Sequence, residues 1–557
     1  MFHALPLYKG MPGPFWYFGA QALRTFVVRL NQRMPEASAA APSTGHQQHR
    51  FLTNVLWSWT GVAASFFQGL IIPPILLRKL GVEHYGIWLQ IFNILDYFWF
   101  FDMGLQPAVT NFCARFLALH DHRKLNEVIN TALFYFTMIG AFVWCVSPVL
   151  AHFGPRFFKV TAENQHEFST LILMTGVSWG LCIMLHMFLS ALDGFQRFDL
   201  TSRIAVLQVV LRSAGYFVAL QNNLGLVAMC WIFIGTQILG YVLYVLCFRH
   251  AFPDLRFSRV FVKWSMFRDI FRYGIKAFVA SNSTLVLQQS GNTSVGHYLG
   301  QTAVGFYGLP LRLIQQAIDA VSRIGLITRS SAAELSATGQ RESVISLGVY
   351  SNRYSLTLFT PLACYLLVYG HALILRYMNA TMADNSAPLL PVFLLSYGLV
   401  LAGQFNSSSL LYGVNAHGKY ARGLVVEAVC YVGALIWMVP RYGILGAAWT
   451  SAVLMIAVRG IYTPWLVSRA LDTSFVDYMR GIYVRPLLVG VPVVALAWLL
   501  RATVLPGRTI PELLAAGIVC ATTYFAMATF ACIAPHHRAL VFSRIPVLGP
   551  RFVPNRA

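Results

Sequence analysis

Nine ionisable residues fall inside long apolar segments of this sequence. A charged side chain near the middle of a bilayer costs roughly 2.5 to 3.5 kcal/mol on insertion scales, so such residues usually face protein, water or a transport pathway. Cations there suit anionic groups, and carboxylates suit cations or protons. The cations are Arg212, Lys276, Arg312, Arg353 and Arg459, and the carboxylates are Asp96, Asp102, Asp319 and Glu427.

The spacing of two of these cations is informative. From Arg312 to Arg323, polar residues follow one another at intervals of 4, 3 and 4 positions, which places them on one face of a helix. Gln208, Arg212 and Tyr216 form a similar stripe. We expect both stripes to face a cavity or another helix, and Arg212 and Arg312 are the strongest candidates for contact with a ligand.

The other candidates also fit structural roles. Lys276, Arg353 and Arg459 can extend toward a membrane face or fix helix packing. Asp102 lies near the end of its apolar segment, which favours a structural role.

The elements that position these residues are membrane helices. Of the 557 residues, 57% are hydrophobic and only 11% are charged, a composition typical of a polytopic membrane protein. Apolar runs long enough to cross a bilayer predict about fourteen transmembrane helices in an all-α fold. These runs lie near 53–76, 85–109, 127–150, 168–191, 203–221, 224–248, 272–295, 301–322, 344–368, 387–411, 421–439, 443–464, 484–502 and 511–532.

The distribution of Lys and Arg predicts the orientation. Of the 41 such residues, 28 fall on the same side as the N-terminus, 8 on the opposite side and 5 inside spans. Because cytoplasmic loops carry the excess of cations, both termini should be cytoplasmic. The net charge of +21 reflects this asymmetry and attraction to anionic lipids, so it does not indicate nucleic-acid binding.

Internal similarity divides the chain into two repeats. Leu80-Gly81 recurs as Leu299-Gly300, and Leu192-Asp193-Gly194 as Leu411-Tyr412-Gly413, each 219 positions later. LGLVAMCW recurs as YGILGAAW after 218 positions. Each repeat contains six spans, and because this number is even, both halves have the same orientation in the membrane. In transporters of this architecture the substrate passes at the interface between the halves.

These boundaries give six parts. The expected order is a basic cytoplasmic segment with an interfacial helix and linker (1–50), a six-helix bundle (51–250), a basic cytoplasmic loop (251–271), a second six-helix bundle (272–468), two additional helices (469–535) and a basic cytoplasmic tail (536–557).

Other motifs carry little weight. GVNAHGKY has the spacing of a phosphate-binding loop, but Tyr420 replaces the Ser or Thr that would hold magnesium, and no strand precedes it. The nine cysteines are dispersed without a CxxC pair, and the histidines at 120 and 122 lack further ligands, so we expect neither a disulfide framework nor a metal site. No loop is long enough for a separate catalytic domain, which argues against an enzyme.

Several segments resemble a known family. LRKLGVEHYGIW, followed by FDMGLQPAVTNFCARFLALHDHRKL, is similar to the beginning of bacterial polysaccharide transporters of the O-antigen flippase type. They belong to the multidrug/oligosaccharidyl-lipid/polysaccharide (MOP) flippase superfamily. The LDGFQRFD turn and the fourteen spans are also similar, so the resemblance covers about residues 50 to 535.

The resemblance implies a V-shaped pair of six-helix bundles in the bacterial cytoplasmic (inner) membrane, with two C-terminal helices. It implies a flippase that moves a polyprenyl-diphosphate-linked oligosaccharide by alternating access, for an O-antigen, capsule or exopolysaccharide. Membrane lipids and other polysaccharide assembly proteins would be the partners, with no cofactor. Arginine suits phosphate oxygens. We therefore expect a diphosphate-binding cavity containing Arg212 and Arg312, shared with Lys276, Arg353 and Arg459.

The carboxylates have two alternative roles in gating or coupling. Asp96 and Asp319 pair with cavity cations until the substrate phosphate competes for them, or one carboxylate takes up a proton or sodium ion as the coupling ion. Asp102 and Glu427 are further candidates. The alternative functions are a cation-coupled multidrug exporter of the same superfamily and a membrane-embedded glycan polymerase or ligase. The first span lacks the carboxylate usual in such exporters, and no large outer loop of such enzymes is present.

Overall fold

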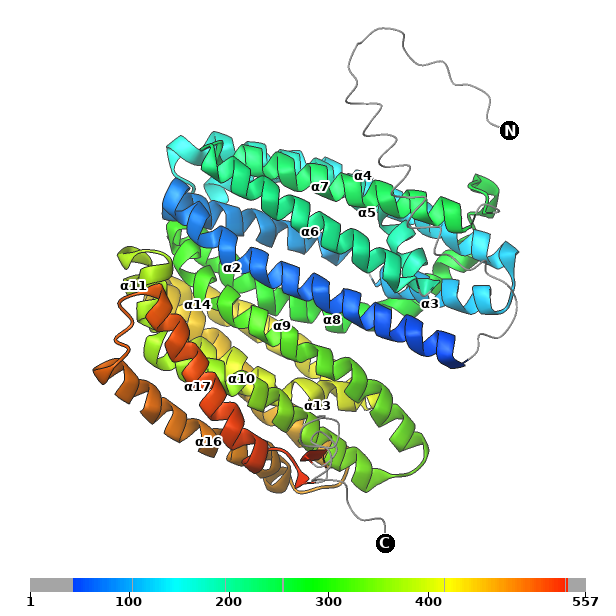
Figure 1. Cartoon of the computed structure of the whole chain (residues 1–557). Helices are drawn as coiled ribbons and strands as arrows, with labels where there is room; N and C mark the ends of the chain where they lie inside the picture. Colours follow the sequence, from blue (N-terminus) through cyan, green and yellow to red (C-terminus); the bar gives the residue numbers. More distant parts are fainter. Residues whose placement is uncertain are drawn as a thin grey trace.

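The computed structural model describes residues 44–102, 104–195, 197–252, 255–414, 416–535 and 537–538, which are almost entirely helical and contain no strand (Figure 1). The all-α prediction is therefore confirmed for these ranges. Nine of the described helices are long and apolar enough to cross a membrane. The number fourteen stays a prediction. Most of the expected N-terminal basic segment and of the C-terminal tail lies outside the described residues.

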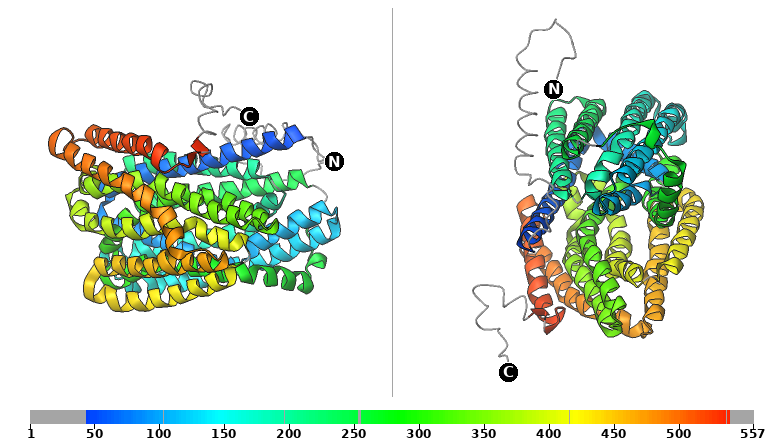
Figure 2. Two further views of the ribbon diagram at one scale, coloured as in Figure 1. Left: turned by 90° about the horizontal axis from the view of Figure 1, so that it is seen from below. Right: turned by 90° about the vertical axis from the view of Figure 1, so that its right-hand side faces the viewer.

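Two groups of helices lie one above the other in Figure 1, and Figure 2 shows the same division from the side. The N-terminal group consists of α2 (Thr44–Tyr97), α3 (Leu105–Ala118), α4 (His122–Phe157), α5 (Gln165–Gly194), α6 (Phe198–Gln221) and α7 (Gly225–Ala251). Short 3-10 helices cover Phe98–Asp102 and Ala162–Asn164.

The C-terminal group follows a 3-10 turn at Arg259–Phe261. It consists of α8 (Trp264–Leu299), α9 (Gln301–Ala337), α10 (Arg341–Tyr377), α11 (Ala380–Ser386), α12 (Leu390–Phe393), α13 (Ala402–Gly413), α14 (His417–Met455) and α15 (Thr463–Ala470). A 3-10 turn covers Ala387–Leu389, and π-helical turns cover Leu394–Leu401 and Ile456–Tyr462. The last helices, α16 (Phe475–Thr503) and α17 (Ile510–Ala531), lie along the outside of this group (Figure 1).

Two boundaries differ from the predicted spans. The apolar run at 85–109 is not one helix, because α2 ends at Tyr97 and α3 begins only at Leu105. Gly104, with φ 73°, adopts a left-handed conformation that ends the continuous helix. The helix α2 is bent at Gly81. The predicted span 53–76 lies in its first arm, and the predicted span 85–109 begins in its second arm.

Both groups bury an apolar core and expose apolar side chains outward. Tyr307, Phe136 and Phe168 are fully buried, whereas Trp231 and Phe530 are 63% and 69% exposed. Exposed apolar side chains of this size on helices that also have a buried core indicate faces in contact with lipid.

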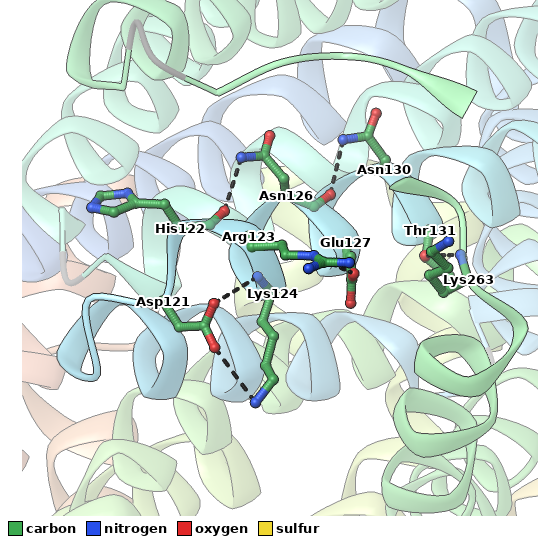
Figure 3. A network of polar contacts seen from close by, with 9 residues as sticks. All are labelled: Asp121, His122, Arg123, Lys124, Asn126, Glu127, Asn130, Thr131 and Lys263. Atoms are coloured by element: carbon green, nitrogen blue, oxygen red, sulfur yellow. Dashed lines mark hydrogen bonds and ion pairs between the residues drawn. The ribbon is translucent and has the colours of Figure 1, made fainter. Parts of the chain in front are cut away.

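The segment that joins the two groups is held against α4. The side chain of Asn126 accepts a hydrogen bond from the backbone N–H of Arg256 at 2.8 Å. Asn130 accepts from the N–H of Ser258 at 2.8 Å and donates to the carbonyl of Arg256 at 2.9 Å. Figure 3 shows these side chains along α4, with Thr131 beside Lys263. The hydroxyl of Thr131 accepts a hydrogen bond from the backbone N–H of Lys263 at 3.1 Å. The connection thus has fixed contacts at both its middle and its end.

Candidate functional site

A row of polar side chains joins α2 to α8, where the N-terminal group meets the C-terminal group. Asn93 donates to the hydroxyl of Thr293 at 2.8 Å, and the hydroxyl of Tyr97 lies 3.0 Å from the same oxygen. One turn before Thr293 on α8, the amide of Gln289 donates to the carboxylate of Asp96 at 3.0 Å. Asp96 therefore lies in a polar interface between the two groups.

Arg312 adds a cation to this interface from α9. Its side chain is exposed, and its charge attracts the carboxylate of Asp96, although the two groups form no ion pair within 4 Å. A guanidinium that is near a carboxylate without being bound to it keeps donors for another anion. Of the predicted site residues, the structure thus brings Asp96 and Arg312 together.

The helix α9 packs closely on both arms of α2. A methyl group in place of the hydrogen of Gly69 would overlap the amide of Gln316, and one at Gly86 would overlap the backbone carbonyl of Gln301. Gln316 belongs to the polar stripe predicted from Arg312 to Arg323. Asp319 lies exposed on α9, and the side chain of Arg323 is outside the described part.

One end of the interface is closed by hydrogen bonds to the end of α4. The side chain of Gln301 donates to the carbonyl of Phe158 at 2.8 Å, and Lys159 donates to the carbonyl of Tyr298 at 2.9 Å. His297 lies 2.8 Å from the carbonyl of Phe157. In the orientation that the charge distribution predicts, this is the outer end.

Arg212 lies within the N-terminal group. Its guanidinium donates to the hydroxyl of Thr236 at 3.2 Å and to the side-chain carbonyl of Gln237 at 2.9 Å, both on α7. It also lies over the ring of Phe233, 4.8 Å from the centroid. These partners are neutral, so they orient Arg212 without neutralising its charge.

Glu427 and Arg459 form a buried ion pair in the C-terminal group. The distance from Nε of Arg459 to Oε2 of Glu427 is 3.3 Å, and the side chains are 12% and 0% exposed. Arg459 belongs to the π-helical turn Ile456–Tyr462, and π-helical turns are frequent at functional sites. Each charge has the other as its partner, and the second carboxylate oxygen of Glu427 is buried without a hydrogen bond.

The remaining predicted residues lie elsewhere. Arg353 lies on α10 and donates to the carbonyl of Gly481 of α16 at 2.6 Å. Asp102 ends the 3-10 turn before α3, where its carboxylate faces the backbone amides of Gly104 and Gln106. Lys276 belongs to α8, and its side chain is outside the described part. The roles of all nine residues as ligands or coupling groups stay predictions.

Reasoning from charge missed the neutral members of the interface. Gln289, Thr293 and His297 follow one another at intervals of four on α8, and Asn93 and Tyr97 do so on α2. The spacing rule applied to Arg312 would have found these stripes. It would not have indicated that they face each other.

Known proteins are similar to this chain in sequence and in fold. Residues 51–322 match the model of the family described as polysaccharide biosynthesis protein. A Shigella flexneri protein assigned as an O-antigen transporter is 20% identical over 432 residues, covering 75% of this chain and 98% of that protein. The N-terminal half of the chain is thus similar to polysaccharide transporters.

Solved structures of the MOP superfamily share the fold. The lipid II flippase MurJ in an inward closed conformation superposes with a TM-score of 0.65 at 13% identity, covering 87% of this chain and 100% of that one. An inward-facing multidrug resistance transporter of the MATE family gives a TM-score of 0.60 at 14% identity, covering 73% and 96%. The predicted similarity to this superfamily is confirmed at the level of the fold. The long apolar helices and the similarity to membrane proteins support a multi-pass membrane protein.

Proposed function

We propose that this protein translocates a polyprenyl-diphosphate-linked oligosaccharide across the cytoplasmic membrane for the synthesis of a surface polysaccharide. The observation that carries the proposal is the exposed guanidinium of Arg312 beside Asp96, at the interface of α2, α8 and α9. This interface joins the two helix groups, and such an interface is where transporters built from two halves carry their substrate.

The chemistry of the interface suits a diphosphate. Its phosphate oxygens accept hydrogen bonds from a guanidinium in pairs, which a drug cation cannot do. The neutral donors and acceptors of Asn93, Gln289 and Thr293 suit sugar hydroxyls, because such groups bind without adding charge. The polyprenyl chain would stay in the bilayer, where burying it costs nothing.

Asp96 gives the site a means of release. When no substrate is bound, its carboxylate attracts Arg312, and a diphosphate that enters competes for the same guanidinium. Uptake of a proton or sodium ion by Asp96 is the alternative form of coupling. In the first case Asp96→Asn strengthens substrate binding and slows release, whereas in the second it abolishes the dependence of transport on the ion gradient.

The decisive experiment measures the sidedness of the lipid-linked oligosaccharide in inner-membrane vesicles. Vesicles would come from cells with the intact protein, without it, with Arg312→Ala, and with Arg422→Ala. Arg422 is an exposed cation on α14 and serves as the matched control. Loss of a charge-assisted contact should lower flipping at least about tenfold in Arg312→Ala, with little change in the control.

The outcomes separate function from site. Accumulation of the lipid in the inner leaflet without the protein and in Arg312→Ala supports both. An unchanged distribution without the protein rejects the flippase, and drug export becomes the leading function. If Arg312→Ala alone behaves like the intact protein, transport stands and Arg312 is not part of the site.

A further inference from the structure

The face of α10 that packs near Gly481 of α16 contains a pocket. A pocket of about 280 Å³ is formed along one face of α10. Its lining residues are Glu342, Ile345, Ser346, Val349, Tyr350 and Arg353. Gly481 of α16 packs closely on this face, because a methyl group in place of its hydrogen would come within 2.9 Å of Val349.

Arg353 is the cationic group of this pocket. The residue is only 7% exposed, and its Nε donates to the carbonyl of Gly481 at 2.6 Å. It lies 5.3 Å from the ring centroid of Tyr350. Within the described part of the chain, no carboxylate lies within 4 Å of its guanidinium. A buried cation without a counterion is unfavourable unless an anion binds beside it.

Arg485 increases the positive charge at the same place. It follows Gly481 by four positions, one turn along α16, and its charge repels that of Arg353. Arg485 is exposed, so it can move toward an anion that Arg353 binds. Glu342 lines the far end of the pocket in the first turn of α10, about 16 Å along the helix from Arg353 at about 1.5 Å per residue.

The pocket lies at the level of a membrane surface. Residues 486–500 of α16, which follow Arg485, carry no charge, so Arg485 marks where the hydrocarbon region begins. The hydroxyl of Tyr354, next to Arg353, lies 2.7 Å from His537, just beyond the end of α17. In the predicted orientation this surface is that of the inner leaflet.

We propose that the pocket binds the phosphate of an anionic phospholipid such as phosphatidylglycerol. The guanidinium of Arg353 would hold the phosphate, with Arg485 as a second donor. Ile345 and Val349 suit the start of an acyl chain, and basic pockets between transmembrane helices on the cytoplasmic side bind lipid head groups. This site is separate from the interface of α2, α8 and α9, so it does not depend on the proposed transport function.

The test counts bound lipid on the purified full-length protein by native mass spectrometry during titration with phosphatidylglycerol, with phosphatidylcholine as the neutral lipid. The variants are Arg353→Gln, Arg485→Gln and Arg480→Gln. Arg480 is an exposed cation on another side of α16 and controls for unspecific surface attraction. We expect Arg353→Gln to weaken phosphatidylglycerol binding about tenfold, Arg485→Gln to weaken it less, and Arg480→Gln to leave it unchanged.

Three results would overturn the proposal. These are equal loss in Arg480→Gln and Arg353→Gln, unchanged binding in both Arg353→Gln and Arg485→Gln, and displacement of the lipid by millimolar inorganic phosphate, which would indicate a site for soluble phosphate. If Arg353→Gln does not fold, Arg353→Lys and the exposed Arg485→Gln carry the test.

Discussion

Gly81 and Gly300 adopt the same unusual backbone conformation, 219 positions apart in the chain. The φ and ψ angles are 87° and 176° at Gly81, and 84° and −178° at Gly300. Gly225 and Gly443, 218 positions apart, also share positive φ values of 75° and 61°. Matching turns at the offsets found in the sequence support the two-repeat interpretation, which stays a prediction.

Replacing either glycine of the first pair should strain the fold. At φ near +85° with extended ψ, a residue with a side chain costs about 1 to 3 kcal/mol. Nothing lies within 4 Å of a methyl group at Gly81, so Gly81→Ala measures backbone strain without a clash. We expect both Gly81→Ala and Gly300→Ala to lower the thermal stability of the detergent-solubilised protein.

Gly433 is the matched control for this pair of substitutions. It lies inside α14, without a positive φ and with open space around its hydrogen. Gly433→Ala should stabilise the helix by about 0.5 to 1 kcal/mol. Equal effects at Gly81 and Gly433 would contradict the strained turn.

The buried pair of Glu427 and Arg459 should be strongly coupled. Removing one partner, as in Glu427→Leu, leaves a buried charge alone and should destabilise the protein by about 3 to 5 kcal/mol. Replacing both, with Glu427→Leu and Arg459→Met, should restore most of the loss. A double-mutant cycle of thermal unfolding measures this, and additive effects of the two substitutions would show that the pair is not an energetic unit.

The contacts of Asn130 should protect the connection between the helix groups. Asn130→Ala removes two hydrogen bonds to that segment, so limited proteolysis should cut residues 255–263 faster. Asn222→Ala removes only a bond to the carbonyl of Val218 on its own helix and should leave the cleavage rate unchanged. Resistance of Asn130→Ala equal to that of the unaltered protein would mean that other contacts hold the segment.

Stability should depend on pH through His84. Its Nε2 lies 3.4 Å from the carboxylate of Glu167, and this hydrogen bond raises the pKa of His84 above 6.5. The pair therefore stabilises the fold fully below the unfolded pKa, and this contribution is lost as pH rises through the folded pKa. We expect the melting temperature to fall as pH rises from about 6 to about 8.

Two variants test this assignment. Glu167→Gln should flatten the pH dependence, because the neutral amide no longer favours the charged imidazole. Glu163→Gln, at an exposed carboxylate four positions earlier in the chain, should keep the slope. A slope that survives Glu167→Gln would assign the pH dependence to another group.

The helical fold and the superfamily could be predicted from the sequence, because apolar length and turn motifs are local properties. The break between Tyr97 and Leu105 was missed, since the aromatic run FWFF continues the apolar pattern across it. Asp102 and Gly104 mark the end of the continuous helix there. The carboxylate of Asp102 lies near the first backbone amides of α3, and Gly104 has a positive φ.

The candidate site was predictable only in part. Charge in an apolar segment singled out Asp96 and Arg312, but their proximity depends on how α2 and α9 pack. The pairing of Glu427 with Arg459, 32 positions later, likewise follows from tertiary contacts. Gln289 and Thr293 carry no charge. The search for ionisable residues in apolar segments therefore did not select them.

The hydrogen bonds of Asn126, Asn130 and Thr131 also bear on how the two helix groups move. A slack connection would let one group change its tilt without affecting the other. Here the chain is attached to α4 up to Lys263, and α8 starts at the next residue. A change in the tilt of α4 therefore acts directly on the first turn of α8, and α8 also carries Gln289 and Thr293.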